Sequence, residues 1–157
     1  MRSVLLIGYG NPGRLDDGLG PQLAVELGGR GIPGLTVDSD YQLTVEDADS
    51  VARYEVAVFA DAAAAGSEPF YFRKLAPGGS SGIGSHSVEP AEVLALSQTL
   101  FNRLPEAYVL GIRGYAFNEF GEGLSDQARA NLEKAATFIE RVIRDGRFAE
   151  SECGQER

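Results

Sequence analysis

The stretch that decides the fold is residues 4–27, which read VLLIGYGNPGRLDDGLGPQLAVEL. The run from Val4 to Ile7 is apolar throughout, as is typical of a strand buried on both faces of a parallel sheet. Leu19, Leu23 and Leu27 recur at helical spacing and predict a helix that begins at Leu19. A glycine-containing loop, residues 8–18, joins the two. Strand, loop and helix in this order are typical of an α/β sheet with helices on its faces.

The rest of the chain continues this alternation. Further strands are predicted at residues 35–37, 56–59, 70–72 and 107–112, and helices at residues 45–54 and 88–101. The clearest helix lies between Ser125, a favoured N-cap residue, and Gly146, a favoured residue just beyond a helix. We therefore expect one α/β domain over residues 1–148, followed by a polar, disordered tail over residues 149–157.

The composition excludes some classes of protein. The formal net charge is −9, whereas nucleic-acid binding relies on a basic face. No stretch approaches the roughly 20 apolar residues of a membrane span, and no secretory signal pattern precedes Val4. The single cysteine, Cys153, has no disulfide partner, which predicts an inert thiol and a reducing compartment. We expect a cytoplasmic protein that binds neither nucleic acid nor membrane.

The loop that follows the first strand allows two interpretations. Residues 8–13, Gly-Tyr-Gly-Asn-Pro-Gly, match the G-x-G-x-x-G pattern of dinucleotide-binding folds, and Asp38 and Asp40 fall where a ribose-binding acid would lie. In such folds the helix begins within the glycines, so that its N-terminus faces the pyrophosphate. Here the helical pattern begins later, and Asp16 or Asp17 is the natural N-cap. Two carboxylates would then repel a phosphate, which disfavours the nucleotide-binding interpretation.

Three segments bring metal-ligating side chains to one edge of the expected sheet. Asp17 follows the first strand, Asp61 follows the strand at 56–59, and His86, the only histidine, precedes the helix at 88–101. In α/β sheets, ligand groups lie at the carboxyl ends of the strands. A helix N-terminus disfavours the charged imidazolium, and neutral imidazole is the form that binds metals. Two carboxylates and an imidazole predict a site for a divalent metal, although each aspartate could instead serve only as a cap or a loop turn.

Together these segments resemble the hydrogenase maturation endopeptidases, which remove a C-terminal peptide from the nickel-loaded large subunit of NiFe hydrogenases. The family's N-terminal pattern of G-x-G-N, an acidic pair and a later glycine appears here as Gly8-Tyr9-Gly10-Asn11, Asp16-Asp17 and Gly20. Its strand-end Asp-Ala appears as Asp61-Ala62, and its helix-opening histidine as His86. The resemblance runs from about residue 2 to residue 143, and it implies that the family's three metal ligands are Asp17, Asp61 and His86.

The resemblance implies a fold, an activity and a partner. The fold is a three-layer α/β/α sandwich with a five-stranded mixed, mostly parallel sheet in the order 2-1-3-5-4. The activity is removal of the C-terminal extension of a hydrogenase large-subunit precursor by a monomeric endopeptidase. The nickel is carried by that substrate and serves as the recognition handle, and other divalent metals can substitute in vitro. Asp17 and Asp61 would be catalytic: either one is a candidate base, and polarisation of the scissile carbonyl by nickel is an equal alternative. A nickel-binding chaperone without protease activity is a further alternative.

One segment departs from the family pattern. Many members carry an Asp-Gly-Gly-Thr-like turn after the second strand, where this chain has Asp38-Ser39-Asp40-Tyr41-Gln42-Leu43. Together with Pro69-Phe70 and Ile112-Arg113-Gly114, this segment resembles the branch that serves bidirectional, NAD-reducing hydrogenases. The altered turn bears on which precursor is processed. If nickel is not the recognition handle, residues 38–43 and loop 114–123 are the first places where substrate recognition is expected.

Overall fold

The computed structural model describes residues 2–78 and 88–157, which fold around one five-stranded sheet. The strands are β1 (Val4–Tyr9), β2 (Leu35–Asp40), β3 (Val56–Ala63), β4 (Phe70–Lys74) and β5 (Glu106–Arg113). Their order is β2-β1-β3-β5-β4. β2, β1, β3 and β5 run parallel, and β4, at one edge, runs antiparallel to β5. The expected mixed sheet and its strand order are confirmed.

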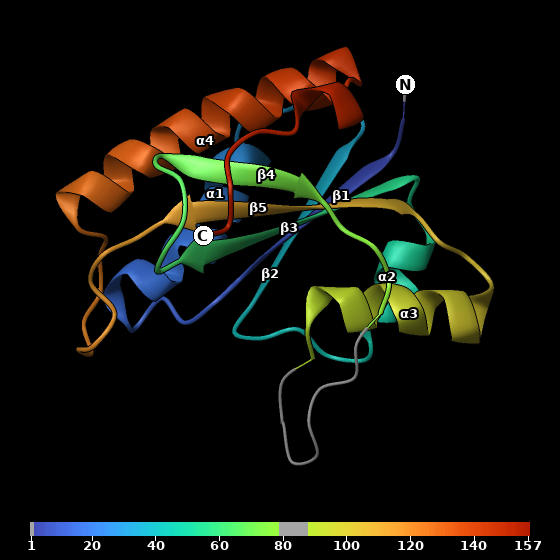
Figure 1. Cartoon of the computed structure of the whole chain (residues 1–157), viewed down its shortest axis with the longest axis horizontal. Coiled ribbons are helices and arrows are strands. Elements are labelled where there is room, and N and C mark those ends of the chain that lie inside the picture. The colour runs from blue at the N-terminus through green and yellow to red at the C-terminus, as the bar shows by residue number, and fades with distance from the viewer. Residues whose placement is uncertain (1, 79–87) are drawn as a thin grey trace.

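Helices cover both faces of this sheet (Figure 1). α1 (Leu19–Gly28) and α4 (Asp126–Asp145) lie on one face, and α2 (Asp47–Ala52) and α3 (Pro90–Phe101) lie on the other. Two short 3-10 turns, η1 (Leu15–Gly18) and η2 (Ala149–Ser151), precede α1 and follow α4. None of the described helices is both long and apolar enough to cross a lipid bilayer.

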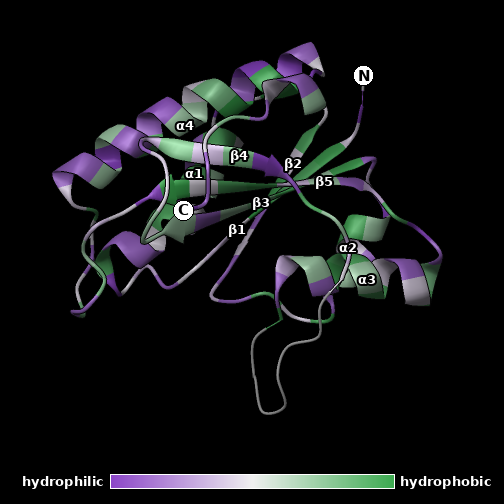
Figure 2. Ribbon diagram, viewed as in Figure 1, coloured by the Kyte–Doolittle hydropathy of each residue, from purple (hydrophilic) through white to green (hydrophobic). Residues whose placement is uncertain are grey.

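Each face of the sheet has its own apolar core, because successive side chains of a strand point to opposite faces. Val4 and Leu6 of β1 join the cluster under α1 and α4, whereas Leu5 and Ile7 join the cluster under α2 and α3. The hydropathy colours of Figure 2 follow this arrangement: the strands in the middle of the sheet are hydrophobic, and α4 alternates between hydrophobic and hydrophilic bands. A helix that covers a sheet packs its apolar face on the sheet and turns its polar face to solvent.

The helix boundaries show where sequence patterns were sufficient. α4 begins after Ser125, whose hydroxyl accepts a hydrogen bond from the N–H of Ala128 at 3.3 Å, and it ends before Gly146, as expected. α1 begins at Leu19, also as expected. Its N-cap, however, is Gly18, and no side chain caps it. The expectation that Asp16 or Asp17 caps this helix is therefore wrong.

The polar segment 149–157, which we expected to be disordered, is placed against the sheet. η2 opens it, and Cys153 then forms an isolated antiparallel bridge with Phe72 of β4. Main-chain N–H and C=O groups make this bridge. The polar side chains of the segment therefore gave no sign of it.

Candidate active site at the carboxyl ends of the strands

Asp61 lies in a row of residues that crosses three strands. In the sheet register Asp61 of β3 pairs with Gly111 of β5, and Gly111 pairs with Tyr71 of β4. A Cβ atom on Gly111 would lie 2.2 Å from ring atoms of Tyr71. The missing side chain at Gly111 therefore lets the buried Tyr71 ring lie across β5. Asp61 consequently has an aromatic ring as its neighbour on the α2–α3 side of the sheet.

The environment of Asp61 gives its carboxyl group a high affinity for a proton. Burial raises the pKa of Asp61 to about 7, and the negative charges of Asp17 and Glu89 add to the rise. The N–H of Ala62, at 2.8 Å, and the hydroxyl of Tyr9 donate hydrogen bonds that oppose it. In the part of the chain that the structure describes, no lysine or arginine forms an ion pair with Asp61 or Asp17.

Asp17 reaches the same region from η1. Its Oδ2 accepts a hydrogen bond from the N–H of Asn11 at 2.8 Å, which folds the glycine loop back on itself. A Cβ atom on Gly20 would lie 2.5 Å from the carbonyl oxygens of both Tyr9 and Ala60, so only glycine lets the start of α1 pack directly on the ends of β1 and β3. This close packing brings η1 against β3. The charge of Asp17 is then near enough to raise the pKa of Asp61.

Asp16 does not cap the helix but anchors the turn that carries Asp17. Its side chain is fully buried. Oδ2 accepts hydrogen bonds from the N–H groups of Tyr115 (2.8 Å) and Ala116 (2.9 Å) and from the hydroxyl of Ser125 (2.7 Å), while Oδ1 accepts one from the N–H of Ser125 (2.7 Å). Burial alone would raise the pKa of Asp16, but these hydrogen bonds outweigh it and lower the pKa below its ordinary value. Asp16 thus fastens η1 to the loop 114–125.

A pocket of about 280 Å³ opens beside Asp61. Residues of β1, β3, β4 and β5 and the first residues of α3 form its walls. The lining residues are Tyr9, Asp61, Tyr71, Arg73, Lys74, Leu75, Glu89, Pro90, Ala91, Val109 and Glu156. Burial, together with the charges of Glu156 and Asp61, raises the pKa of Tyr71 to about 12, so its hydroxyl stays protonated at neutral pH.

The third expected ligand cannot be placed in this way. His86 lies outside the described residues, although Glu89, which follows it closely in the chain, is the N-cap of α3 and lines the pocket. Within residues 2–78 and 88–157, no group of three His, Cys, Asp or Glu side chains could hold a metal ion. The structure therefore brings Asp17 and Asp61 to one edge of the sheet, and His86 as their partner stays a prediction.

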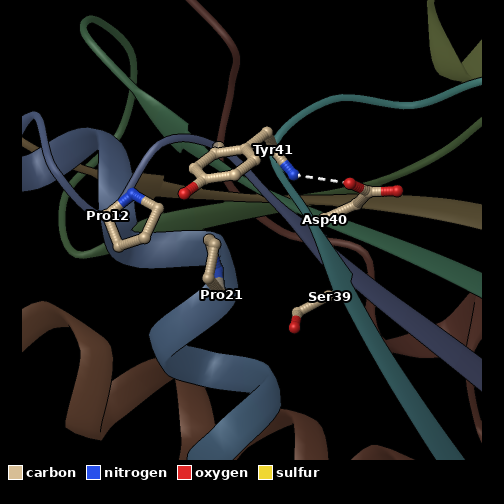
Figure 3. A pocket seen from close by; sticks show the side chains of 6 residues that line it. Pro12, Pro21, Ser39, Asp40 and Tyr41 are labelled. Atoms are coloured by element: carbon tan, nitrogen blue, oxygen red, sulfur yellow. Dashed lines mark hydrogen bonds between the residues drawn. The ribbon is translucent and has the colours of Figure 1, made fainter.

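A second pocket, of about 210 Å³, lies between the glycine loop and the end of β2. Figure 3 shows Tyr41 reaching from β2 toward Pro12, with Pro21 below it. The carboxylate of Asp40 accepts a hydrogen bond from the N–H of Tyr41 at 2.8 Å, and the Tyr41 side chain is 68% exposed. This pocket places the segment 38–43, which departs from the family pattern, directly beside the loop 8–13.

The geometry of the glycine loop does not suit a nucleotide. α1 starts only after the loop, and the Asn11 N–H that could contact a phosphate is already bonded to Asp17. Asp16 and Asp17 both precede the helix in η1. A phosphate at this helix N-terminus would face carboxylates where dinucleotide folds offer free N–H groups.

Sequence reasoning missed three features of the site. It did not assign the anchoring role of Asp16, the contact between Gly111 and Tyr71, or the presence of Glu156 in the pocket. Only the Gly111–Tyr71 contact has a signal in the sequence, because a glycine inside an apolar strand often marks a place where another group packs against the backbone.

No protein-family model and no curated protein sequence matches this chain. Solved structures match it over most of its length. The hydrogenase maturating endopeptidase HybD from E. coli is 18% identical, with a TM-score of 0.71, and the match covers 92% of this chain and 94% of that one. The NiFe hydrogenase maturation protease HycI from Thermococcus kodakarensis is 19% identical, with a TM-score of 0.70 and coverage of 91% and 93%. HybD from the same archaeon is 21% identical, with a TM-score of 0.63 and coverage of 90% and 99%. The chain therefore has the fold of the hydrogenase maturation proteases.

Proposed function

We propose that this chain is a hydrogenase maturation endopeptidase, which removes the C-terminal extension from the nickel-loaded precursor of a NiFe hydrogenase large subunit. The observation that carries the proposal is that Asp17, on η1, lies near enough to Asp61, in the last part of β3, for its charge to act on that carboxyl group. Connections leave the neighbouring strands β1 and β3 in opposite directions, and ligands of α/β sheets bind at such points. Burial is the main cause of the raised pKa of Asp61, and the charge of Asp17 adds to it. A divalent cation between the two carboxylates would relieve that repulsion.

The roles follow from chemistry and position. Nickel arrives as part of the substrate, and Asp17, Asp61 and His86 complete its ligand set with oxygen and nitrogen donors. This contact positions the scissile bond at the pocket beside Asp61. Asp61, oriented by the hydroxyl of Tyr9, is the better placed of the two carboxylates to take a proton from the attacking water. The substrate's nickel polarises the scissile carbonyl.

Nickel also serves as the recognition handle in this proposal. Three protein ligands leave the coordination sphere incomplete, so the free protein should hold nickel weakly. The substrate's own ligands complete the sphere, and a precursor without nickel lacks this contact. The protein acts as a monomer on a cytoplasmic precursor.

The test presents nickel-loaded and nickel-free large-subunit precursor to the purified protein and follows the mass of the large subunit. We expect cleavage of the nickel-loaded form alone, and loss of cleavage in Asp61→Asn and His86→Ala. Asp145→Asn is the matched control, because Asp145 is an exposed residue at the end of α4. Nickel added to the protein alone should not rescue the nickel-free precursor.

Each contrary outcome points to one alternative. Equal cleavage of both precursors would remove nickel from recognition. Nickel binding without cleavage would make the protein a chaperone, and tight binding of NAD or ATP would support a nucleotide-binding module. Near-wild-type cleavage by His86→Ala would remove the imidazole from the ligand set.

A further inference from the structure

The segment 152–156 lies along the outer edge of β4, the antiparallel edge strand of the sheet. The N–H of Phe72 donates to the carbonyl oxygen of Cys153 at 2.8 Å, and the N–H of Cys153 donates to the carbonyl oxygen of Phe72 at 2.9 Å. Two residues further along β4, the N–H of Lys74 donates to the side chain of Glu152 at 2.7 Å. The chain thus occupies the hydrogen-bonding edge of its own sheet.

Beyond Cys153 the segment runs toward the candidate active site. Gln155 exchanges hydrogen bonds with Ser67, in the loop after β3, at 2.9 Å and 2.8 Å. Glu156 then lines the same pocket as Asp61. In Figure 1 the red end of the chain crosses β4 and finishes near the arrowhead of β3. An extended chain that follows this path therefore reaches the pocket that contains Asp61.

The segment is held by hydrogen bonds and adds little apolar packing. Its pairing with β4 is a single bridge, and the one salt bridge, from Arg73 to Glu152, is long at 3.9 Å. Gln155 and Glu156 are exposed, and Cys153 is the one residue of the segment that packs on the apolar core. A segment that is held mainly by main-chain hydrogen bonds, with one side chain on the core, opens at a lower cost than the sheet itself. Main-chain pairing of this kind can be offered equally well by another extended peptide.

We propose that the outer edge of β4 is a peptide-binding edge, that segment 152–156 occupies it in the free protein, and that the extended end of the precursor takes its place before cleavage. The proposal rests on the proposed function for the identity of that peptide. The chemistry that fits is an extended chain with a small residue at the position of Gly154 and a carboxylate at that of Glu152. Both chains need the same N–H and C=O of Phe72, so they compete.

The experiment locks and releases the segment in the full-length protein. Ser67→Cys with Gln155→Cys places two thiols at a pair of hydrogen-bonded residues, and Cys153→Ser removes the native thiol. A labelled synthetic peptide that copies the precursor's C-terminal extension is the probe, and fluorescence polarisation measures its binding. We expect the oxidised protein to bind the probe at least about tenfold more weakly than the reduced protein, because a closed edge is removed from the binding equilibrium. Ser67→Cys with Cys153→Ser, which has a single thiol, should not respond to oxidation.

Release is tested with Gly154→Val. Gly154 has a φ of +75°, and a Cβ atom there would lie 3.0 Å from the Phe70 carbonyl oxygen and Tyr71, so valine should expel the segment. Gly31→Val is the matched control, because Gly31 also has a positive φ but has open space around it. We expect Gly154→Val to bind the probe several-fold more tightly than the wild type, and Gly31→Val to bind it equally.

Equal binding by the oxidised and reduced forms, or no gain in Gly154→Val, would overturn the inference and make the segment a permanent cover for the sheet edge. Absence of probe binding by every variant would overturn it as well. These measurements need no cleavage, so they stand apart from the processing test. A protein that binds the probe as expected but never shortens nickel-loaded precursor would refute the proposed endopeptidase activity and leave the peptide-binding edge supported.

Discussion

Replacing Asp16 should destabilise the protein far more than the loss of a helix cap. A capping aspartate contributes about 1 kcal/mol. Asp16 instead accepts four hydrogen bonds while fully buried. Asp16→Ala leaves three main-chain N–H groups without their acceptor, and each unsatisfied buried group costs about 1–3 kcal/mol before relaxation. Partial relaxation and entry of water reduce that sum, so we expect a loss of about 3–5 kcal/mol in the free energy of unfolding.

Asp16→Asn separates charge from hydrogen bonding. An amide oxygen at the position of Oδ2 keeps the bonds from Tyr115, Ala116 and the Ser125 hydroxyl, but the amide nitrogen then meets the N–H of Ser125, donor against donor. We expect a loss of about 2 kcal/mol for this single conflict. Both variants should also process precursor poorly, because η1 holds Asp17 in place.

The assay is urea unfolding followed by circular dichroism, with Asp145→Asn as the control. With a slope of about 2 kcal/mol per molar urea, the midpoint of Asp16→Ala should fall by about 2 M. The pKa of Asp16 is lower in the folded protein than in the unfolded chain. Its stabilisation is therefore fully present above the unfolded value of about 3.9 and is lost as the pH falls through the folded value. The difference between wild type and Asp16→Asn should be constant from neutral pH down to about pH 5 and should shrink below pH 4. A loss near 1 kcal/mol in Asp16→Ala, with no such pH dependence, would refute the anchoring role.

Three further predictions concern other parts of the molecule. Gly111→Ala should push the Tyr71 ring out of the pocket and abolish processing while the protein stays folded, which near-UV circular dichroism and the cleavage assay can show together. Tyr41→Ala should leave the unfolding midpoint unchanged, because Tyr41 is 68% exposed, but should raise KM for the precursor; an unchanged KM would exclude the pocket of Figure 3 from recognition. Burial alone would raise the pKa of Glu106, but the hydrogen bonds from Arg2 and Tyr108 lower it overall. Glu106→Gln should therefore cost at most about 1 kcal/mol in urea unfolding at neutral pH, and this loss should shrink as the pH falls below the unfolded value of about 4.3.

Much of the fold could be predicted because its signals are local. The continuous apolar run at Val4–Ile7 and the regular spacing of the leucines from Leu19 are enough to predict a buried strand and a helix. α4 begins after Ser125, whose side chain caps the helix, and ends before Gly146, which has a positive φ. Each of these signals depends on a single residue. β2 is a weaker case, since only Leu35 and Val37 of it are even partly buried and its last residues are exposed and polar.

The missed features depend on contacts between residues far apart in the chain. Asp16 and Asp17 are adjacent and identical, so no local pattern can tell which one turns inward to the loop 114–125 and which turns to the strand ends. Segment 152–156 is held by its main chain, and its polar side chains indicate disorder. Long-range contacts of these kinds leave little mark on a single sequence.

The bond between Asp16 and Ser125 spans 109 residues, and it has a consequence for how the protein comes to be made. Synthesis delivers the N-terminal strand and the acidic turn first, whereas the loop that fixes this turn comes just before the last long helix. Contacts so distant in sequence form late, because the chain between them must be ordered first. A nascent chain therefore carries Asp17 on an unfixed turn until α4 has docked. The candidate site is therefore complete only after the chain up to the end of α4 has folded.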